Sequence, residues 1–211
     1  MAYDLGILGT GRMGVRLARM FADAGRSVLL GSRDPERAAA AARELRSARV
    51  VPGSYEQAAE AKAVLPAVFL RDGLLDILEP LSGRLDNKLV IDISNPFNED
   101  YSDFTTAWDT SAAEELQKRI PAARLVGAFK NVFWGVFDDP LFLGTPSDVL
   151  VTGDNAAAKQ VFLRLAEGTP FRYLDAGPLI NSRTVERMTM ITGALGRQIG
   201  AYPRMNWRLL G

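Results

Sequence analysis

The sequence predicts an α/β protein with a Rossmann-type, doubly wound and mainly parallel sheet, followed by a small C-terminal helical extension. The first observation behind this prediction is a strand-like run, a glycine-rich turn at residues 9–14 and an amphipathic helical segment, in that order. The second is the alternation of strand-like and helical segments along the chain, which is typical of parallel sheets with right-handed crossovers. The third is a length of 211 residues, enough for one such domain.

The segment Gly-Thr-Gly-Arg-Met-Gly at residues 9–14 predicts a dinucleotide-binding turn. Gly9 permits the tight turn, Gly11 lets the backbone approach a pyrophosphate, and Gly14 allows the helix to pack closely on the strand. Free N–H groups at the start of the helix would bind the phosphates. The alternative is a sharp turn without a ligand, which the strand–turn–helix context disfavours.

The end of the second strand predicts the choice of cofactor. In a dinucleotide fold this strand end approaches the adenine ribose, where Asp or Glu favours NAD. Here Ser32 and Arg33 occupy the strand end, and Arg37 follows in the first turn of the next helix. A hydroxyl and two guanidinium groups suit a ribose phosphate, so we predict NADP. The alternative is a solvated pair of arginines.

The remaining elements follow from apolar runs, capping signals and turn residues. Strands are expected at residues 3–8, 27–30, 49–51, 63–70, 88–93, 124–129, 148–152 and 171–175. Helices are expected at residues 12–24, 35–46, 54–61, 73–81, 111–118, 155–167 and 182–199. Pro66 is unusual inside a strand, and the polar and aromatic stretch at 97–109 is the longest expected loop.

Composition excludes several kinds of chemistry. The chain has no Cys and no His, which removes disulfides, thiolate catalysis, zinc–sulfur sites and the commonest acid/base side chain. The formal net charge is zero, so it gives no case for nucleic acid or an anionic membrane as a partner. We expect no metal site. No signal peptide or membrane-spanning run is apparent, and we expect a cytoplasmic protein.

Three segments together resemble the family of short NADP-dependent deazaflavin (coenzyme F-420) oxidoreductases. They are residues 9–14, the Gly-Ser-Arg at 31–33 and Asp-Ala-Gly-Pro-Leu-Ile-Asn-Ser-Arg at 175–183. This family is related to the reductase domain of the six-transmembrane epithelial antigen proteins. The resemblance implies one NADP-binding Rossmann domain over residues 1–211, with 178–211 as a helix and tail, and a homodimer.

The resemblance also implies the site residues. The pyrophosphate would be held by Thr10, Gly11, Arg12 and Met13 between Gly9 and Gly14, and the 2′-phosphate by Ser32, Arg33 and Arg37. The nicotinamide ribose would lie beside Ala67, Val68 and Phe69, and the nicotinamide end beside Asn95, Pro96, Ala128 and Phe129. Phe69 stands where many relatives carry proline, and Lys130 where a smaller or uncharged residue is expected. Both departures lie near the expected second-substrate pocket.

Three functions remain open at this point. The first is hydride transfer between NADP(H) and a second substrate, most simply a deazaflavin coenzyme. The second is NADPH-dependent reduction of a small imine or ketone, with Lys130, Tyr101 or Asp175 supplying a proton. The third is a regulatory NADP-binding protein without turnover. Lys130 and Asn95 are the candidate catalytic residues, and we expect Lys130 beside the nicotinamide, acting on the second substrate. The alternative for Lys130 is an ordinary surface lysine.

The C-terminal helix predicts an assembly. Its apolar residues are Val185, Met188, Ile191, Ala194, Leu195 and Ile199, and the tail adds Tyr202, Trp207 and Leu209. One sheet would cover only part of this surface, so we expect a two-fold dimer built largely from residues beyond Asn181. The alternative is a helix folded entirely onto its own sheet.

Overall fold

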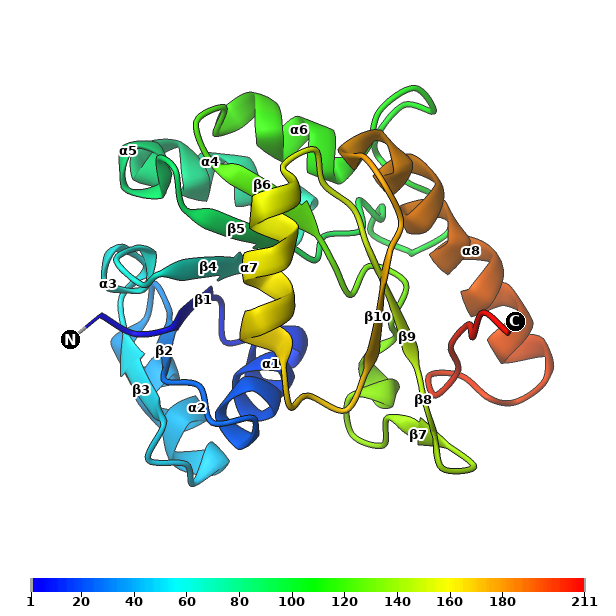
Figure 1. The fold of residues 1–211 in the computed structure, drawn as a ribbon, viewed down its shortest axis with the longest axis horizontal. Helices are drawn as coiled ribbons and strands as arrows, with labels where there is room; N and C mark the ends of the chain where they lie inside the picture. The colour runs from blue at the N-terminus through cyan, green and yellow to red at the C-terminus, as the bar shows by residue number, and fades with distance from the viewer. Residues whose placement is uncertain (1, 211) are drawn as a thin grey trace.

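The computed structural model describes residues 2–210 and has a six-stranded parallel sheet at its centre, in the order β3-β2-β1-β4-β5-β6 (Figure 1). Its strands are β1 (Leu5–Leu8), β2 (Val28–Gly31), β3 (Val50–Gly53), β4 (Ala63–Pro66), β5 (Leu89–Asp92) and β6 (Arg124–Gly127). The strand order reverses between β1 and β4. Open α/β sheets bind ligands at the carboxyl ends of the strands beside such a switch point.

Helices follow most of the strands. They are α1 (Arg12–Asp23), α2 (Pro35–Leu45), α3 (Tyr55–Ala59), α4 (Leu74–Leu78), α5 (Ser82–Leu85), α6 (Ala112–Arg119), α7 (Ala156–Ala166) and α8 (Ser182–Gln198). The single helix expected at 73–81 is instead α4 followed by a 3-10 turn at Glu79–Leu81. Pro80 in this turn has no N–H to continue an α-helical ladder.

Successive residues of each central strand contribute to two different cores, one on either face of the sheet. In β1, Ile7 belongs to a core with Leu17 and Phe21 of α1. The next residue, Leu8, belongs to the other core with Ala58 of α3 and Leu78 of α4. This alternation follows from the two-residue period of a strand. Helices therefore cover both faces, and the predicted doubly wound fold is confirmed.

β4 is shorter than the strand expected at residues 63–70, and Pro66 is its last residue. β5 pairs only with Ala63 and Val64 of β4. The missing N–H of Pro66 therefore costs no bond of the sheet. The chain leaves the sheet directly afterwards, at the edge where the sequence places Ala67, Val68 and Phe69.

Two expected strands lie outside the main sheet. β9 (Asp148–Val151) and β10 (Arg172–Asp175) pair in parallel as a separate two-stranded sheet. An antiparallel bridge between Gly127 and Thr152 links this sheet to the end of β6. A short hairpin of β7 (Leu141–Phe142) and β8 (Thr145–Pro146), which the sequence analysis did not foresee, precedes β9.

The C-terminal segment is helical, as predicted, and the tail folds back along β9 and α8 (Figure 1). The Trp207 indole N–H donates to the Thr192 hydroxyl over 2.6 Å. The Leu209 N–H donates to the Asp148 carboxylate over 2.8 Å. Both contacts tie the tail to the body of the protein.

Candidate functional site

The glycine-rich segment at residues 9–14, which runs from the end of β1 into α1, has two positions that only glycine can occupy. Gly9 has a φ of +125°, and a Cβ there would lie 2.7 Å from the Ala67 carbonyl oxygen. A Cβ on Gly14 would lie 2.0 Å from the Gly9 carbonyl oxygen. At Gly11, in contrast, an added Cβ would meet no atom within 4 Å. Gly11 is also the N-cap of α1 and provides no capping side chain. The start of α1 thus offers uncapped N–H groups beside open space, which fits a pyrophosphate.

Arg12 adds positive charge at the start of α1. Its guanidinium carbon lies 4.7 Å from the centre of the Trp134 ring, and that of Arg16 lies 5.1 Å from it. Arg16 pairs with Asp138 over 2.7 Å. No ion pair found within residues 2–210 includes Arg12. Arg12 is therefore available to a phosphate at the start of α1. Its contact with Trp134 was not predicted from the sequence, because Trp134 follows a different strand.

The β2 end brings together the side chains expected to hold a 2′-phosphate. Ser32 is buried, and its hydroxyl accepts the Asp34 N–H over 3.1 Å. Arg33 and Arg37 are exposed, and neither takes part in an ion pair among the described residues. Burial raises the pKa of the Tyr55 hydroxyl, while the nearby Arg33 and Arg37 oppose that rise. Tyr55 is thus a neighbour of this basic site that the sequence analysis did not single out.

The predicted nicotinamide-end residues follow β4, β5 and β6. The Ala67 N–H donates to the Leu8 carbonyl over 2.8 Å, and Phe69 is 37% exposed. The Asn95 amide nitrogen donates to the Lys130 carbonyl over 2.8 Å. The Ala128 side chain is fully buried in a core, so only its backbone is available to line a site.

An aromatic loop follows Asn95 and is ordered around Arg71. The Arg71 guanidinium carbon lies 4.3 Å from the ring centre of Phe69 and 4.5 Å from that of Tyr101. The same group donates to the Phe97 carbonyl over 2.9 Å. Phe97 in turn packs edge to face against Phe104, with ring centres 5.0 Å apart. Sequence alone did not reveal that Arg71 holds this loop against Phe69.

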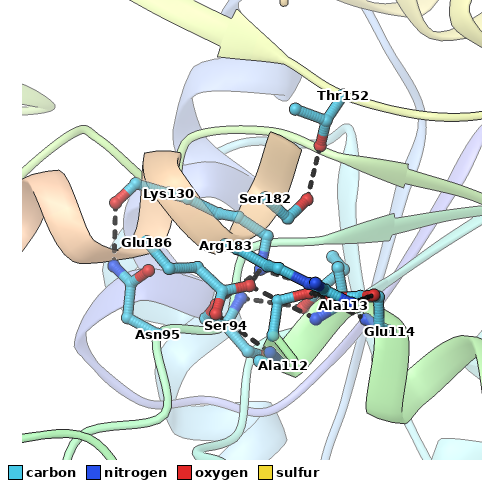
Figure 2. Close-up of polar contacts among 12 residues, drawn as sticks. Ser94, Asn95, Ala112, Ala113, Glu114, Lys130, Thr152, Ser182, Arg183 and Glu186 are labelled. Atoms are coloured by element: carbon cyan, nitrogen blue, oxygen red, sulfur yellow. Dashed lines mark hydrogen bonds and ion pairs between the residues drawn. The ribbon is translucent and has the colours of Figure 1, made fainter. Parts of the chain in front are cut away.

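The expected position of Lys130 is wrong. Its side chain is completely buried, with its ammonium 2.5 Å from an Asp92 oxygen. The ammonium also lies 2.8 Å from an oxygen of Glu186 (Figure 2). The ammonium also donates to the Ser94 carbonyl over 2.6 Å. Lys130 therefore neither reaches a second substrate nor lies on the surface.

The two carboxylates, opposed by burial, set the charge of the Lys130 ammonium. Burial lowers the pKa of the Lys130 ammonium, but the Asp92 and Glu186 carboxylates outweigh burial and hold that pKa above its ordinary value. Burial raises the pKa of the Glu186 carboxyl. An ammonium held charged by two carboxylates is a poor proton donor, so its role is structural or positional.

Residues 4–96 match the family described as NADP oxidoreductase, coenzyme F420-dependent. The F420-dependent NADP reductase of Methanothermobacter thermautotrophicus is 31% identical over 197 residues, covering 86% of this chain and 83% of the relative. That of Methanocaldococcus jannaschii is 30% identical over 196 residues, covering 86% of each. This chain belongs to the coenzyme F420-dependent NADP oxidoreductase family.

The family resemblance extends to a larger protein. Metalloreductase STEAP3 of Rattus norvegicus is 30% identical over 190 residues, covering 90% of this chain. The chain spans only 37% of that relative. Among the helices formed by residues 2–210, none combines the length and apolarity that crossing a membrane requires.

Solved structures agree with this family in fold. A crystal structure from Arthrobacter sp. superposes with a TM-score of 0.87 at 23% identity, covering all of both chains. Plasmodium falciparum pyrroline carboxylate reductase with NADP bound has a TM-score of 0.55 at 15% identity, covering 82% of this chain and 58% of that one. No group of His, Cys, Asp or Glu side chains that could hold a metal ion occurs in residues 2–210.

Proposed function

We propose that this chain transfers hydride between NADP(H) and a second substrate, most simply a deazaflavin coenzyme. Family membership makes it an NADP-dependent oxidoreductase. The observation that carries the choice of NADP is the pair of exposed guanidinium groups of Arg33 and Arg37, which have no carboxylate partner among the described residues. A strand end that offers arginines and no acid favours a ribose phosphate over a free ribose.

The residues around the switch point would hold the cofactor in three parts. Gly11, Arg12 and Met13 would bind the pyrophosphate through N–H groups and one guanidinium. Ser32, Arg33 and Arg37 would bind the 2′-phosphate. Ala67, Val68 and Phe69 would border the nicotinamide ribose, with Asn95 and Pro96 beyond them. NADP supplies the hydride, and the protein supplies orientation and a dry surface for the ring.

The aromatic loop supports a flat second substrate. Phe69 and Tyr101 are 37% and 47% exposed, and both rings face the Arg71 guanidinium. A deazaflavin ring would pack on such a surface, and exchange of hydride between two stacked rings needs no protein acid. Burial of Lys130 removes one proton donor from the imine or ketone alternative. Asp175 pairs with Lys159 over 2.7 Å, which leaves Tyr101 for that role.

The test is turnover with defined acceptors. Purified protein is mixed with NADPH and an oxidised deazaflavin, and the absorbance of both is followed. We expect both to be consumed in equal amounts, with a much slower reaction from NADH. A Tyr101→Phe variant should retain its rate with the deazaflavin because stacking does not need the hydroxyl. Binding of NADPH without any oxidation by the deazaflavin would contradict the proposal, and turnover of an imine panel would favour the alternative.

We also propose that two copies pair through α8. Its outward residues Ile191 and Leu195 are 56% and 42% exposed, and its C-cap residue Ile199 is 72% exposed. They repeat every four positions and so form one apolar stripe on the helix. The opposite face of α8, which includes Val185 and Thr189, is buried against the protein. A second copy, related by a two-fold axis, would cover the stripe. The cytoplasmic location remains a prediction.

A further inference from the structure

The side-chain amide of Asn95 is held in one orientation at the end of β5. Its nitrogen donates to the Lys130 carbonyl over 2.8 Å. A backbone carbonyl only accepts, so the amide oxygen must point the other way. That oxygen, Oδ1, is buried and has no hydrogen-bond partner among the described residues. An unpaired buried acceptor typically costs ~1–3 kcal/mol, and a ligand that donates to Oδ1 would remove this cost.

Lys130 holds Asn95 from two directions (Figure 2). Its backbone carbonyl accepts the Asn95 amide, and its ammonium donates to the carbonyl of the preceding residue, Ser94, over 2.6 Å. Lys130, which follows β6, therefore fixes both the backbone before Asn95 and the side chain of Asn95. The chain would otherwise be free to rotate here, since it has just left the sheet.

The ammonium is itself fixed by two carboxylates from distant elements. Asp92 is the last residue of β5, and Glu186 lies on α8. Glu186 also accepts the N–H groups of Ala112 and Ala113, in the first turn of α6, over 2.9 and 3.3 Å. β5 and α8 thus meet at the Lys130 ammonium, and α6 is linked to it through Glu186. Removing one partner of such a buried pair is costly, which makes the arrangement rigid.

The location of Asn95 fits a ligand of the proposed NADP site. β4 lies between β1 and β5 in the sheet, and all three are parallel. Ala67 after β4 and Asn95 after β5 therefore emerge at the same edge as the glycine-rich loop after β1. The nicotinamide end of the cofactor is expected there, because the adenosine end is directed toward β2.

We propose that Asn95 Oδ1 accepts a hydrogen bond from the carboxamide NH₂ of the nicotinamide, and that Lys130 is the positioning residue that aims it. The carboxamide nitrogen is the only hydrogen-bond donor on a nicotinamide ring. Fixing that group fixes which face of the ring meets the second substrate, and hydride transfer depends on this orientation. The proposal rests on the proposed function, because it takes NADP(H) as the ligand.

The test compares NADP⁺ with its 3-acetylpyridine analogue, in which a methyl group replaces the carboxamide NH₂. Calorimetry gives the dissociation constants of both for the wild type and for Asn95→Leu. We expect the wild type to prefer NADP⁺ by about tenfold, the value of one good hydrogen bond. In Asn95→Leu the preference should fall to within about twofold of none. An unchanged preference in Asn95→Leu would overturn the proposal.

A matched control separates this effect from general damage. Asn181 also donates its amide to a backbone carbonyl, that of Ala176, over 2.6 Å, but it lies in the turn before α8. Asn181→Leu should keep the wild-type preference. Adenosine 2′,5′-bisphosphate, which lacks the nicotinamide, should bind wild type and Asn95→Leu equally. If the wild type binds neither dinucleotide, the proposed function fails, whereas equal binding of both overturns only this inference.

The role of Lys130 needs variants that fold. Lys130→Met alone leaves Asp92 and Glu186 buried without a cation, so Lys130→Met/Asp92→Asn is measured beside it. Glu186 keeps its two N–H donors from α6 in that double variant. We expect the folded variants to bind adenosine 2′,5′-bisphosphate normally and to lose at least about threefold of the preference for NADP⁺. A wild-type preference in either folded variant would show that Lys130 does not position Asn95.

Discussion

Phe129 and Phe21 pack edge to face with ring centres 6.3 Å apart, although the Phe129 backbone has a φ of +58°. A non-glycine residue at positive φ is strained, and the burial of its ring compensates. Phe129 directly precedes Lys130, so this positive-φ turn lies immediately before the buried lysine.

The positive φ of Phe129 predicts an unusual order of stability between its Ala and Gly variants. Phe129→Ala should lower the free energy of unfolding by about 3–5 kcal/mol, because a fully packed ring is lost. Phe129→Gly should cost no more than Phe129→Ala, since glycine adopts positive φ freely. Phe162, buried in the middle of α7, is the control: there Gly should be worse than Ala. Urea denaturation of the four variants measures these free energies of unfolding. The same order of the Ala and Gly variants at both positions would contradict the prediction.

The basic strand end predicts cofactor preference. Arg33→Ala should weaken NADPH binding by ~1.5–3 kcal/mol, the value of a hydrogen bond to a charged group, and leave NADH binding nearly unchanged. Arg43→Ala, an exposed arginine in the last turn of α2, is the matched control and should change neither. Fluorescence titration with both cofactors measures this. Equal affinity of the wild type for NADPH and NADH would rule out the assignment of this site.

The apolar stripe on α8 predicts that a charge introduced into it will prevent dimer formation. Leu195→Asp should convert a dimer to a monomer at micromolar concentration, because association would bury an unpaired carboxylate. The monomer should remain folded, since Leu195 is 42% exposed within one copy. Leu143→Asp, at the fully exposed tip of the β7–β8 hairpin, should leave the mass unchanged. Light scattering that finds a wild-type monomer would refute the proposed interface.

The ion pair between Asp4 and Lys62, at the end of the sheet where the strands begin, predicts an acid-dependent loss of stability. The Lys62 ammonium, followed by the Ser27 N–H, lowers the pKa of the Asp4 carboxyl from 3.8 to about 2. The contact therefore stabilises the fold above pH 3.8 and is lost as the pH falls toward 2. Asp4→Asn should flatten the pH dependence of the unfolding free energy in this window. Urea titrations of both proteins between pH 5 and 2 measure the difference, and parallel curves would count against it.

Local patterns were sufficient for the main sheet and the cofactor loop. The run at 3–8 and the spacing of Gly9, Gly11 and Gly14 predict β1, the turn and α1, because each depends on near neighbours. The environment of Lys130 could not be found in this way. Its partners Asp92 and Glu186 lie 38 positions before it and 56 after it. Nothing in the local sequence indicates that three charged groups from β5, the β6 end and α8 will meet in one core.

Local sequence patterns also could not predict that β9 and β10 form a sheet separate from the main one. Asp148–Val151 and Arg172–Asp175 alternate with a helix just as the central strands do. What distinguishes them is the antiparallel approach of Thr152 to Gly127, a long-range pairing. A periodic pattern predicts that a strand exists and leaves its neighbour open.

The stacking of Arg12 on Trp134 gives the protein its own optical reporter. Of the three tryptophans, Trp134 contacts Arg12, whereas Trp108 contacts Arg187 and Trp207 is hydrogen-bonded to Thr192. A guanidinium resting on an indole alters its emission, and a pyrophosphate that drew Arg12 toward the start of α1 would uncover the Trp134 ring. Cofactor binding would then change the fluorescence of one indole, and comparison with a Trp134→Phe variant would assign that change to Trp134 without any added dye.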